Sequence, residues 1–227
     1  MEGAVAIVLA AGRGDRLGGE TPKAFASLGG RPLLAHAAST ASSARGVAYL
    51  VVAAPAGWED LARAVVEPMA PHVVVRGGES RQASVRSALA AVPEGASTIL
   101  CHDAARALAP VELFEAVLEA LAGWDGVVPV LPVADTVKRV RGEVVERTEE
   151  RAGLALAQTP QAFGAEALRD AHARAARDGL EVTDDAAVLE AAGYRVRAVA
   201  GDPRASKITT AEDLARAEAV VAELARG

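Results

Sequence analysis

Short apolar runs alternate with amphipathic segments along almost the whole chain, and this alternation limits the possible folds more than any other feature of the sequence. The apolar runs have the length and composition of buried strands, and the segments between them have helical periodicity. The strand-like runs are residues 5–9, 47–53, 72–75, 98–101, 126–130 and 195–199, and the helix-like segments are residues 32–44, 58–66, 84–91, 111–121, 165–177, 185–192 and 211–224. Strands that alternate with helices form a mostly parallel sheet, so we predict a Rossmann-like α/β fold with helices on both faces of the sheet.

The composition indicates one folded unit over the full 227 residues. Hydrophobic residues make up 51% of the chain, which is enough for a core that is large relative to the surface. The sequence has no internal repeat, low-complexity tract or linker-like change of composition. The last helix-like segment begins with Thr210 and has Asp213 three residues later, a capping-box pattern that marks a helix start. We therefore expect residues 1–227 to form a single domain.

Two classes of partner do not fit the sequence. The net charge is −6, there is no basic block, and aromatic residues make up 3% of the chain. A nucleic-acid surface needs positive charge and usually stacking rings, so no nucleic-acid partner is expected. No stretch of about 18 uncharged apolar residues occurs, so no membrane span is expected either.

The start of the chain and its lone cysteine bear on where the protein resides. The apolar run at residues 4–9 has no basic leader, so we expect it to be a first strand rather than a signal peptide. Cys101 has no second cysteine to pair with, and its place in an apolar run favours a small buried side chain. A reducing compartment is the simplest setting for such a chain, and we expect the protein to be cytoplasmic.

One region interrupts the alternation. Between residues 135 and 158 the helical pattern disappears, and residues 136–140 and 143–148 have the character of two polar strands around Gly142. Two strands joined at a glycine turn indicate a β-hairpin. We therefore predict an inserted hairpin arm at residues 135–158. It is either a surface excursion or an arm that packs on another subunit.

The loop after the first strand has the character of a phosphate site. In a parallel sheet this loop lies at the carboxyl edge, where ligands bind. Small residues and glycines let backbone N–H groups approach phosphate oxygens, and Arg16 and Lys23 can neutralise their charge. The small residues are Ala10, Ala11, Gly12 and Gly14. The alternative is a flexible glycine turn with two solvated cations.

Two familiar phosphate loops do not match this segment. A Walker loop requires Ser or Thr after its lysine, but Lys23 is followed by Ala24. A dinucleotide fingerprint requires a third glycine where Leu17 stands, and no acid follows the second strand-like run. The loop is therefore of a different kind.

Polar residues follow two further strand-like runs. Ser84 stands where we expect a helix to begin, and there it either caps that helix or contributes to a ligand site. Asp103 follows the run at residues 98–101, where it either binds Mg²⁺ or a substrate hydroxyl, or pins a loop together with Arg106. Because the run ends at the same sheet edge as the glycine loop, we favour a role in ligand binding.

The motif A-A-G-x-G-x-R followed by P-K, at residues 10–23, resembles the nucleotidyltransferases that activate sugars and sugar alcohols. Further motifs narrow the resemblance to the 2-C-methyl-D-erythritol 4-phosphate cytidylyltransferases. They are G-G-x-x-R-x-x-S-V at residues 77–85, H-D-A-A-R at residues 102–106, T-D-[DE] at residues 183–185 and a late lysine at Lys207. The resemblance covers the chain from the first strand to the last helix. One departure is Ala205, where the family usually has asparagine, which puts a side-chain hydrogen bond from that place in doubt.

This resemblance implies a reaction and a set of site residues. The phosphate of 2-C-methyl-D-erythritol 4-phosphate attacks the α-phosphate of CTP in line, with Mg²⁺ as cofactor, and pyrophosphate leaves. The catalytic residues implied are Arg16, Lys23, Arg151 and Lys207. The binding residues implied are Ala10, Ala11, Gly12, Gly14, Gly78, Glu79, Ser84, Asp103, Ala104, Arg106, Thr136, Thr159 and Thr183, with Asp103 also as metal ligand. The resemblance further implies a homodimer in which Thr136 and Arg151 on the 135–158 arm reach the partner's site.

Three other functions remain open from the residues alone. The chain could act on another polyol phosphate, such as ribitol 5-phosphate, because few side chains decide the acceptor. It could be a sugar-1-phosphate nucleotidyltransferase, which should accept other nucleotides. It could also be a non-catalytic CTP-binding regulator, which binds CTP without releasing pyrophosphate. Thr183 has a second interpretation as well, as the cap of the helix that follows it.

Overall fold

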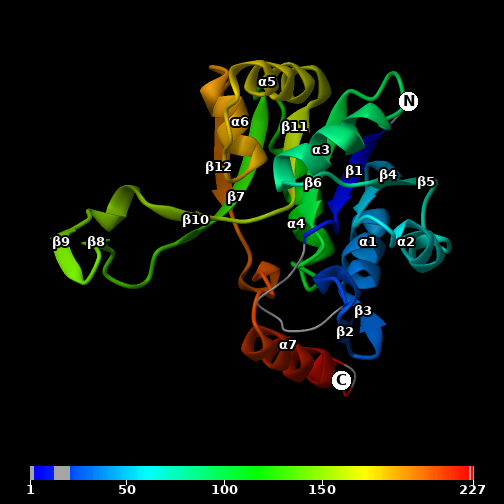
Figure 1. Cartoon of the computed structure of the whole chain (residues 1–227), viewed down its shortest axis with the longest axis horizontal. Coiled ribbons are helices and arrows are strands. Elements are labelled where there is room, and N and C mark those ends of the chain that lie inside the picture. The colour runs from blue at the N-terminus through cyan, green and yellow to red at the C-terminus, as the bar shows by residue number, and fades with distance from the viewer. Residues whose placement is uncertain (1–2, 13–20, 225, 227) are drawn as a thin grey trace.

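The computed structural model describes residues 3–12, 21–224 and 226 and has one central eight-stranded sheet (Figure 1). The strand order is β10-β7-β11-β6-β1-β4-β5, and β12 pairs with β7. Its strands are β1 (Ala4–Leu9), β4 (Val47–Ala54), β5 (His72–Arg76), β6 (Thr98–Asp103), β7 (Gly126–Pro132), β10 (Ala155–Ala157), β11 (Gln161–Gly164) and β12 (Val196–Ala200). The parallel pairs β1–β4, β1–β6, β4–β5 and β7–β12 confirm the predicted mostly parallel sheet.

Strands β10 and β11 were not expected from the sequence. β11 runs antiparallel to both neighbours, pairing with β6 along one edge and with β7 along the other. β10 pairs antiparallel with the end of β7. Each spans only three or four residues, too few for an alternating pattern to stand out in the sequence.

Helices cover both faces of the sheet, as predicted. Helices α1 (Leu33–Ser43), α2 (Glu59–Val66) and α4 (Val111–Glu119) pack on one face, and α3 (Arg81–Ala90), α5 (Ala165–Asp178) and α6 (Asp185–Ala191) pack on the other. Successive side chains of a strand point to opposite faces. In β1, Ala6 and Val8 join the first helix layer, and Val5 and Ile7 join the second.

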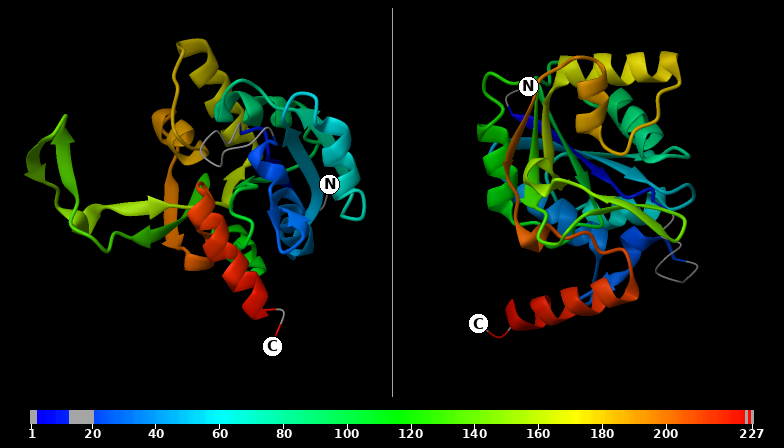
Figure 2. Two further views of the ribbon diagram at one scale, coloured as in Figure 1. Left: turned by 60° about the horizontal axis from the view of Figure 1, so that its bottom comes forward. Right: turned by 90° about the vertical axis from the view of Figure 1, so that its left-hand side faces the viewer.

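Helix α7 (Ala211–Leu224) lies outside these two layers (Figure 2). It contacts the short hairpin of β2 (Ser27–Leu28) and β3 (Arg31–Pro32), where Leu28 and Ala217 are buried together. Asp213 Oδ2 accepts the backbone N–H of Thr210 at 2.9 Å, and Thr210 Oγ1 accepts the N–H of Asp213 at 3.2 Å. The predicted capping box is therefore confirmed.

The hairpin arm projects from the body of the protein (Figure 1). Its strands β8 (Lys138–Arg141) and β9 (Val144–Thr148) pair antiparallel, and all their residues are exposed. Gly142 has φ +59°, which an L side chain rarely adopts, so glycine suits the turn. The predicted hairpin is confirmed. In the part of the chain that the structure describes, no helix is long and apolar enough to cross a membrane.

Candidate active site

A cavity of about 840 Å³ opens at the carboxyl ends of β1, β4, β5 and β6. These four strands are parallel, so the segments that follow them meet at one edge of the sheet. The structure brings many of the residues predicted from the sequence to this cavity. They are Ala10, Ala11, Gly12, Lys23, Gly78, Glu79, Ser84, Asp103, Ala104 and Lys207.

Two glycines allow the segments that line the cavity to approach closely. A Cβ on Gly77 would lie 2.2 Å from Cβ of Ala11, and a Cβ on Gly78 would lie 2.5 Å from Cβ of Ala83. Real Cβ atoms do not come this close, so any side chain at either position would push the segments apart. Glycine at position 77 therefore lets the loop after β5 pack on the loop after β1, and glycine at position 78 lets the same loop pack on the first turn of α3.

Ser84 connects this glycine loop to α3. Its Oγ accepts the N–H of Gly78 at 3.1 Å and donates to the carbonyl of Ser80 at 2.9 Å. The prediction that the helix begins at Ser84 is wrong, because α3 begins at Arg81 and Ser80 is the N-cap. Ser80 Oγ accepts the N–H of Ala83 at 3.1 Å, which satisfies one of the orphan donors of the first turn.

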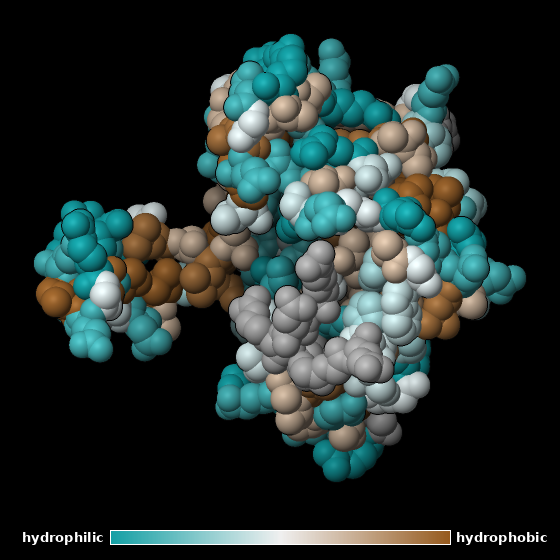
Figure 3. All heavy atoms as spheres, in the orientation of Figure 1, coloured by the Kyte–Doolittle hydropathy of each residue, from teal (hydrophilic) through white to brown (hydrophobic). Residues whose placement is uncertain are grey.

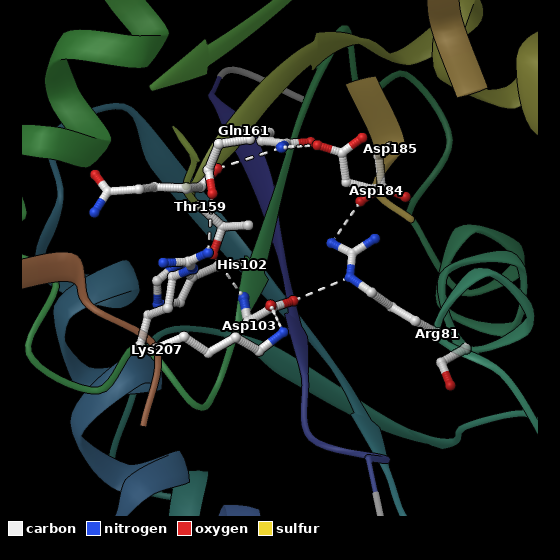
Figure 4. A network of polar contacts seen from close by, with 12 residues as sticks. Arg81, His102, Asp103, Thr159, Gln161, Asp184, Asp185 and Lys207 are labelled. Carbon is white, nitrogen blue, oxygen red and sulfur yellow. Dashed lines mark hydrogen bonds and ion pairs between the residues drawn. The ribbon is translucent and has the colours of Figure 1, made fainter. Parts of the chain in front are cut away.

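Asp103 lies at the wall of the cavity between two cations (Figure 4). Its Oδ1 is 3.1 Å from Nε of Arg81, and its Oδ2 is 2.7 Å from Nζ of Lys207. Burial by itself would raise the pKa of Asp103, but the charges of Arg81 and Lys207 outweigh it and hold the pKa well below its ordinary value. Asp103 is therefore a permanent carboxylate at neutral pH.

Lys207 reaches the cavity from a distant segment. It follows a short 3₁₀ turn, η4 (Pro203–Ala205), and the next residue, Ile208, donates its N–H to the carbonyl of Ala105 at 2.8 Å. Ala205 is fully buried, and its carbonyl accepts from Nη1 of Arg106 at 2.7 Å. Backbone contacts therefore anchor the segment in which the family usually has asparagine.

The profile of the 2-C-methyl-D-erythritol 4-phosphate cytidylyltransferase family (IspD) matches residues 4–223, which is nearly the whole chain. The chain belongs to this cytidylyltransferase family. Its relative from Frankia casuarinae is 48% identical over 221 residues, covering 96% of this chain and 80% of the relative. The relative from Microcystis aeruginosa is 40% identical over 222 residues, covering 96% and 98%. Both are named 2-C-methyl-D-erythritol 4-phosphate cytidylyltransferase.

Some relatives of the cytidylyltransferase family are longer proteins. The bifunctional enzyme IspD/IspF from Clavibacter michiganensis is 49% identical over 224 residues, and the chain spans about half (54%) of its length. Solved structures have the same fold. The cytidylyltransferase from Thermus thermophilus has a TM-score of 0.78 at 40% identity, covering 98% of this chain and 100% of that one. The 4-diphosphocytidyl-2C-methyl-D-erythritol synthase from Anaerococcus prevotii has a TM-score of 0.86 at 28% identity, covering 97% and 99%.

Thr159, expected to bind substrate, is buried behind Asp103 instead of lining the cavity. Its Oγ1 accepts the N–H of Asp103 at 3.0 Å and lies 3.1 Å from Nδ1 of His102. Burial lowers the pKa of His102 to about 4, so the imidazole is neutral at pH 7 and can accept the hydroxyl proton. In this cytidylyltransferase Thr159 therefore holds the backbone that presents Asp103.

Four other predicted residues are not among the described residues that line the cavity. Arg106 joins segments behind it, donating to the carbonyls of Ala205 and Ala157. Thr183 is exposed, and the alternative interpretation that it caps the next helix is wrong, because Asp184 caps α6. Thr136 and Arg151 are exposed on the arm, where Arg151 donates to the carbonyl of Ala134. Gly14 and Arg16 lie outside the described residues.

Sequence reasoning did not assign a role to several residues at the cavity. Arg81 contacts Asp103, although in the sequence it stands out only as one position of the G-G-x-x-R-x-x-S-V motif. Trp58 and Arg76 also line the cavity, and the ring of Trp58 stacks on Phe25 with centroids 5.0 Å apart. The sequence could have indicated Trp58 and Arg76, because they lie at or just after the ends of strands β4 and β5, which finish at the same sheet edge.

Asp103 fits a Mg²⁺ ion that is held mainly by substrate. Within residues 3–12, 21–224 and 226, no group of three or more His, Cys, Asp or Glu side chains could hold a metal by itself. Mg²⁺ usually binds through one or two carboxylates together with substrate phosphates and water. A carboxylate offers about four lone-pair sites, and the two ion pairs of Asp103 leave part of this capacity for a metal.

Proposed function

We propose that the cavity is the site at which this cytidylyltransferase transfers CMP from CTP to 2-C-methyl-D-erythritol 4-phosphate. The products are the 4-diphosphocytidyl compound and pyrophosphate. The observation that carries the proposal is the meeting of Lys23, Asp103 and Lys207 with the two packed glycine loops at one cavity. Together with family membership over residues 4–223, it supports nucleotidyl transfer.

The reaction needs no nucleophile from the protein. An oxygen of the methylerythritol phosphate, already ionised at pH 7, forms a bond to the α-phosphorus of CTP. The bond from that phosphorus to the bridging oxygen breaks, and pyrophosphate leaves with the electron pair. Such a step is accelerated mainly by positioning and by charge stabilisation.

The residues of the chain divide these tasks. Lys23, together with Arg16, stabilises the charge that develops on the α-phosphate and the leaving group. Lys207 holds the attacking phosphate close to a second anion. The glycine loops around Gly12 and Gly78 supply close backbone contact with the nucleotide. Asp103 would hold Mg²⁺, which when bound neutralises charge on the triphosphate oxygens.

The arm supports a homodimer with a shared site. Exposed apolar side chains gather along it, and a second copy of the chain would cover them (Figure 3). They are Val140, Val144, Val145, Leu154 and Leu156. In the proposed dimer, Thr136 and Arg151 complete the partner's cavity and bind the phosphate of the second substrate.

A mixing experiment tests the shared site. We expect Lys23→Ala and Arg151→Ala each to be nearly inactive. Unfolding and refolding an equal mixture should recover about a quarter of the wild-type activity, because half the dimers are mixed and each has one intact site. Recovery of no activity, with mixed dimers present, would rule out that Arg151 acts on the partner's site.

Pyrophosphate release tests the reaction itself. The 227-residue chain with Mg²⁺, CTP and 2-C-methyl-D-erythritol 4-phosphate should release pyrophosphate, and ribitol 5-phosphate should be a poor acceptor. A panel of CTP, UTP, ATP and GTP separates this enzyme from a sugar-1-phosphate nucleotidyltransferase. Binding of CTP without pyrophosphate release would favour a regulator instead.

The buried free thiol of Cys101 fits a reducing compartment, so the proposal includes a cytoplasmic location.

A further inference from the structure

A row of alternating charges runs from the wall of the cavity into the protein interior (Figure 4). Lys207 pairs with Asp103, and Asp103 pairs with Nε of Arg81. Nη2 of the same guanidinium lies 2.8 Å from Oδ2 of Asp185, and Oδ1 of Asp185 lies 3.2 Å from Nε2 of His172. Arg81 therefore bridges a carboxylate at the cavity and a carboxylate behind it.

The inner end of this row is shielded from water. Asp185 and His172 are each 1% exposed, and Asp103 is 7% exposed. A buried charge that loses its partner is strongly destabilised, whereas a complete pair is tolerated. The two carboxylates balance the two cations Arg81 and Lys207, so the charge of Asp185 keeps the row neutral.

The fold fixes Asp185 independently of Arg81. It is the first residue of α6, whose start is set by its neighbour Asp184. Asp184 Oδ1 accepts the N–H of Ala187 at 2.9 Å, and its Oδ2 accepts from Nε2 of Gln161 at 2.9 Å. Because α6 packs in the core, Asp185 is a rigid anchor for the longer arginine side chain.

We propose that Asp185 is a positioning residue for the reaction, which acts by holding Arg81 in place against Asp103. This inference rests on the proposed function. Without the charge of Asp185, Asp103 is the carboxylate with which Arg81 still forms an ion pair. Arg81 then turns toward Asp103 and competes with Lys207 for it. Lys207 and Asp103 leave the places they need for catalysis, although neither has been changed.

The first test is Asp185→Asn, which keeps the shape of the side chain and removes its charge. We expect kcat for pyrophosphate release to fall about tenfold, while the KM for CTP changes less than about threefold. Asp185→Glu restores the charge and should recover a large part of kcat. A normal kcat in folded Asp185→Asn protein would overturn the proposal, and so would failure of Asp185→Glu to recover any activity.

Asp184→Asn is the matched control. It removes a charge from the adjacent residue of the same helix start, and asparagine caps a helix about as well as aspartate. Asp184 has no contact with Arg81 among those the structure gives for the described residues, so kcat should stay within about twofold of wild type. An equal loss of kcat in both variants would assign the effect to displacement of α6 and overturn the positioning role.

A double-mutant cycle with Arg81→Lys shows whether Asp185 acts through Arg81. A lysine cannot bridge two carboxylates as the guanidinium fork does, so Arg81→Lys should itself lower kcat about tenfold. Adding Asp185→Asn to Arg81→Lys should then cost less than about threefold further. Full additivity of the two losses would overturn the proposal.

Two controls keep the outcomes distinct. If Asp185→Asn does not fold, Arg81→Lys carries the test, and a normal kcat in that variant overturns the proposal. An inactive wild-type protein contradicts the proposed reaction instead, since the positioning role is judged only relative to an active wild type.

Discussion

At the scale of single residues, the site depends on charged side chains that neighbouring groups hold in position. Asp103 is held between two cations and by the hydroxyl of Thr159 on its backbone. Lys23 stands in a short 3₁₀ turn, η2 (Lys23–Phe25), whose Phe25 is buried against Trp58. The apolar stacking orders the turn, and the turn presents the lysine to the cavity.

Lys23→Ala should fold normally and lose most turnover. Removing a contact that stabilises developing charge costs on the order of 10²–10³ in kcat. Pyrophosphate release measures the loss, and thermal unfolding checks the fold. Arg45→Ala is the control, because it removes a cation whose partner is Glu115 on the surface, and it should leave kcat unchanged. Near-normal turnover in Lys23→Ala would contradict its role.

Gly77→Ala should weaken CTP binding and stability together. The new Cβ would lie 2.2 Å from Cβ of Ala11, so the two loops must separate. We expect a loss of about 1–3 kcal/mol in the free energy of unfolding and a raised KM for CTP, measured by denaturant titration and steady-state kinetics. Gly164→Ala is the control, since its Cβ would meet no atom closer than 3.8 Å. Equal effects in both variants would count against close packing as the cause.

At the scale of elements, helix starts decide where polar side chains of the site lie. Both errors in assigning helix caps have the same origin, because two capping residues stand close together in each segment. Ser80 rather than Ser84 caps α3, and Asp184 rather than Thr183 caps α6. The sequence shows that a cap is near, but packing against the sheet selects which residue takes the position.

Asp213 at the start of α7 makes the stability of this helix start depend on pH. Hydrogen bonds from the Thr209 side chain and from the backbone of Thr209 and Thr210 hold the pKa of Asp213 below its ordinary value of about 4. Because the pKa of Asp213 is lower in the folded state than in the unfolded state, its stabilisation is complete at pH values above the unfolded-state pKa. The stabilisation is lost as the pH falls toward and through the folded-state pKa. The stability advantage of wild type over Asp213→Asn should therefore shrink below about pH 4. Thermal unfolding from pH 7 to pH 3 tests this, and a constant difference would contradict it.

At the scale of the whole molecule, the outer part of the arm pairs with no other strand in the part of the chain that the structure describes. Strands β8 and β9 form a separate two-stranded sheet, and their side chains are exposed. Two-stranded hairpins are marginally stable alone, so a second copy that covers the apolar side chains of the arm would also order it. Assembly and activity should therefore change together.

Val144→Asp should dissociate the proposed dimer and lower turnover. Val144 is 66% exposed, so an aspartate at this position should not disturb the fold of the single chain. We expect the mass measured by light scattering to halve and kcat to fall at least about tenfold, because Arg151 is then no longer supplied to the partner's site. Leu61→Asp, at an exposed site on α2, is the control. A monomer with full activity would contradict the shared site.

The sequence by itself determined the order of the longer strands and of the helices along the chain, the hairpin and the glycine loops of the site. These features depend on residues close together in the chain, whose periodicity and turn chemistry are local. The tertiary structure decided the pairing of the short strand β11 and the contact of Arg81 with Asp103 at the cavity. Lys207 meets Asp103 across 104 residues of sequence, and only the sheet order and the packing of α3 and α6 bring such groups together. The sequence specifies the type of each side chain, but the partner of that side chain depends on which distant segments share an edge of the sheet.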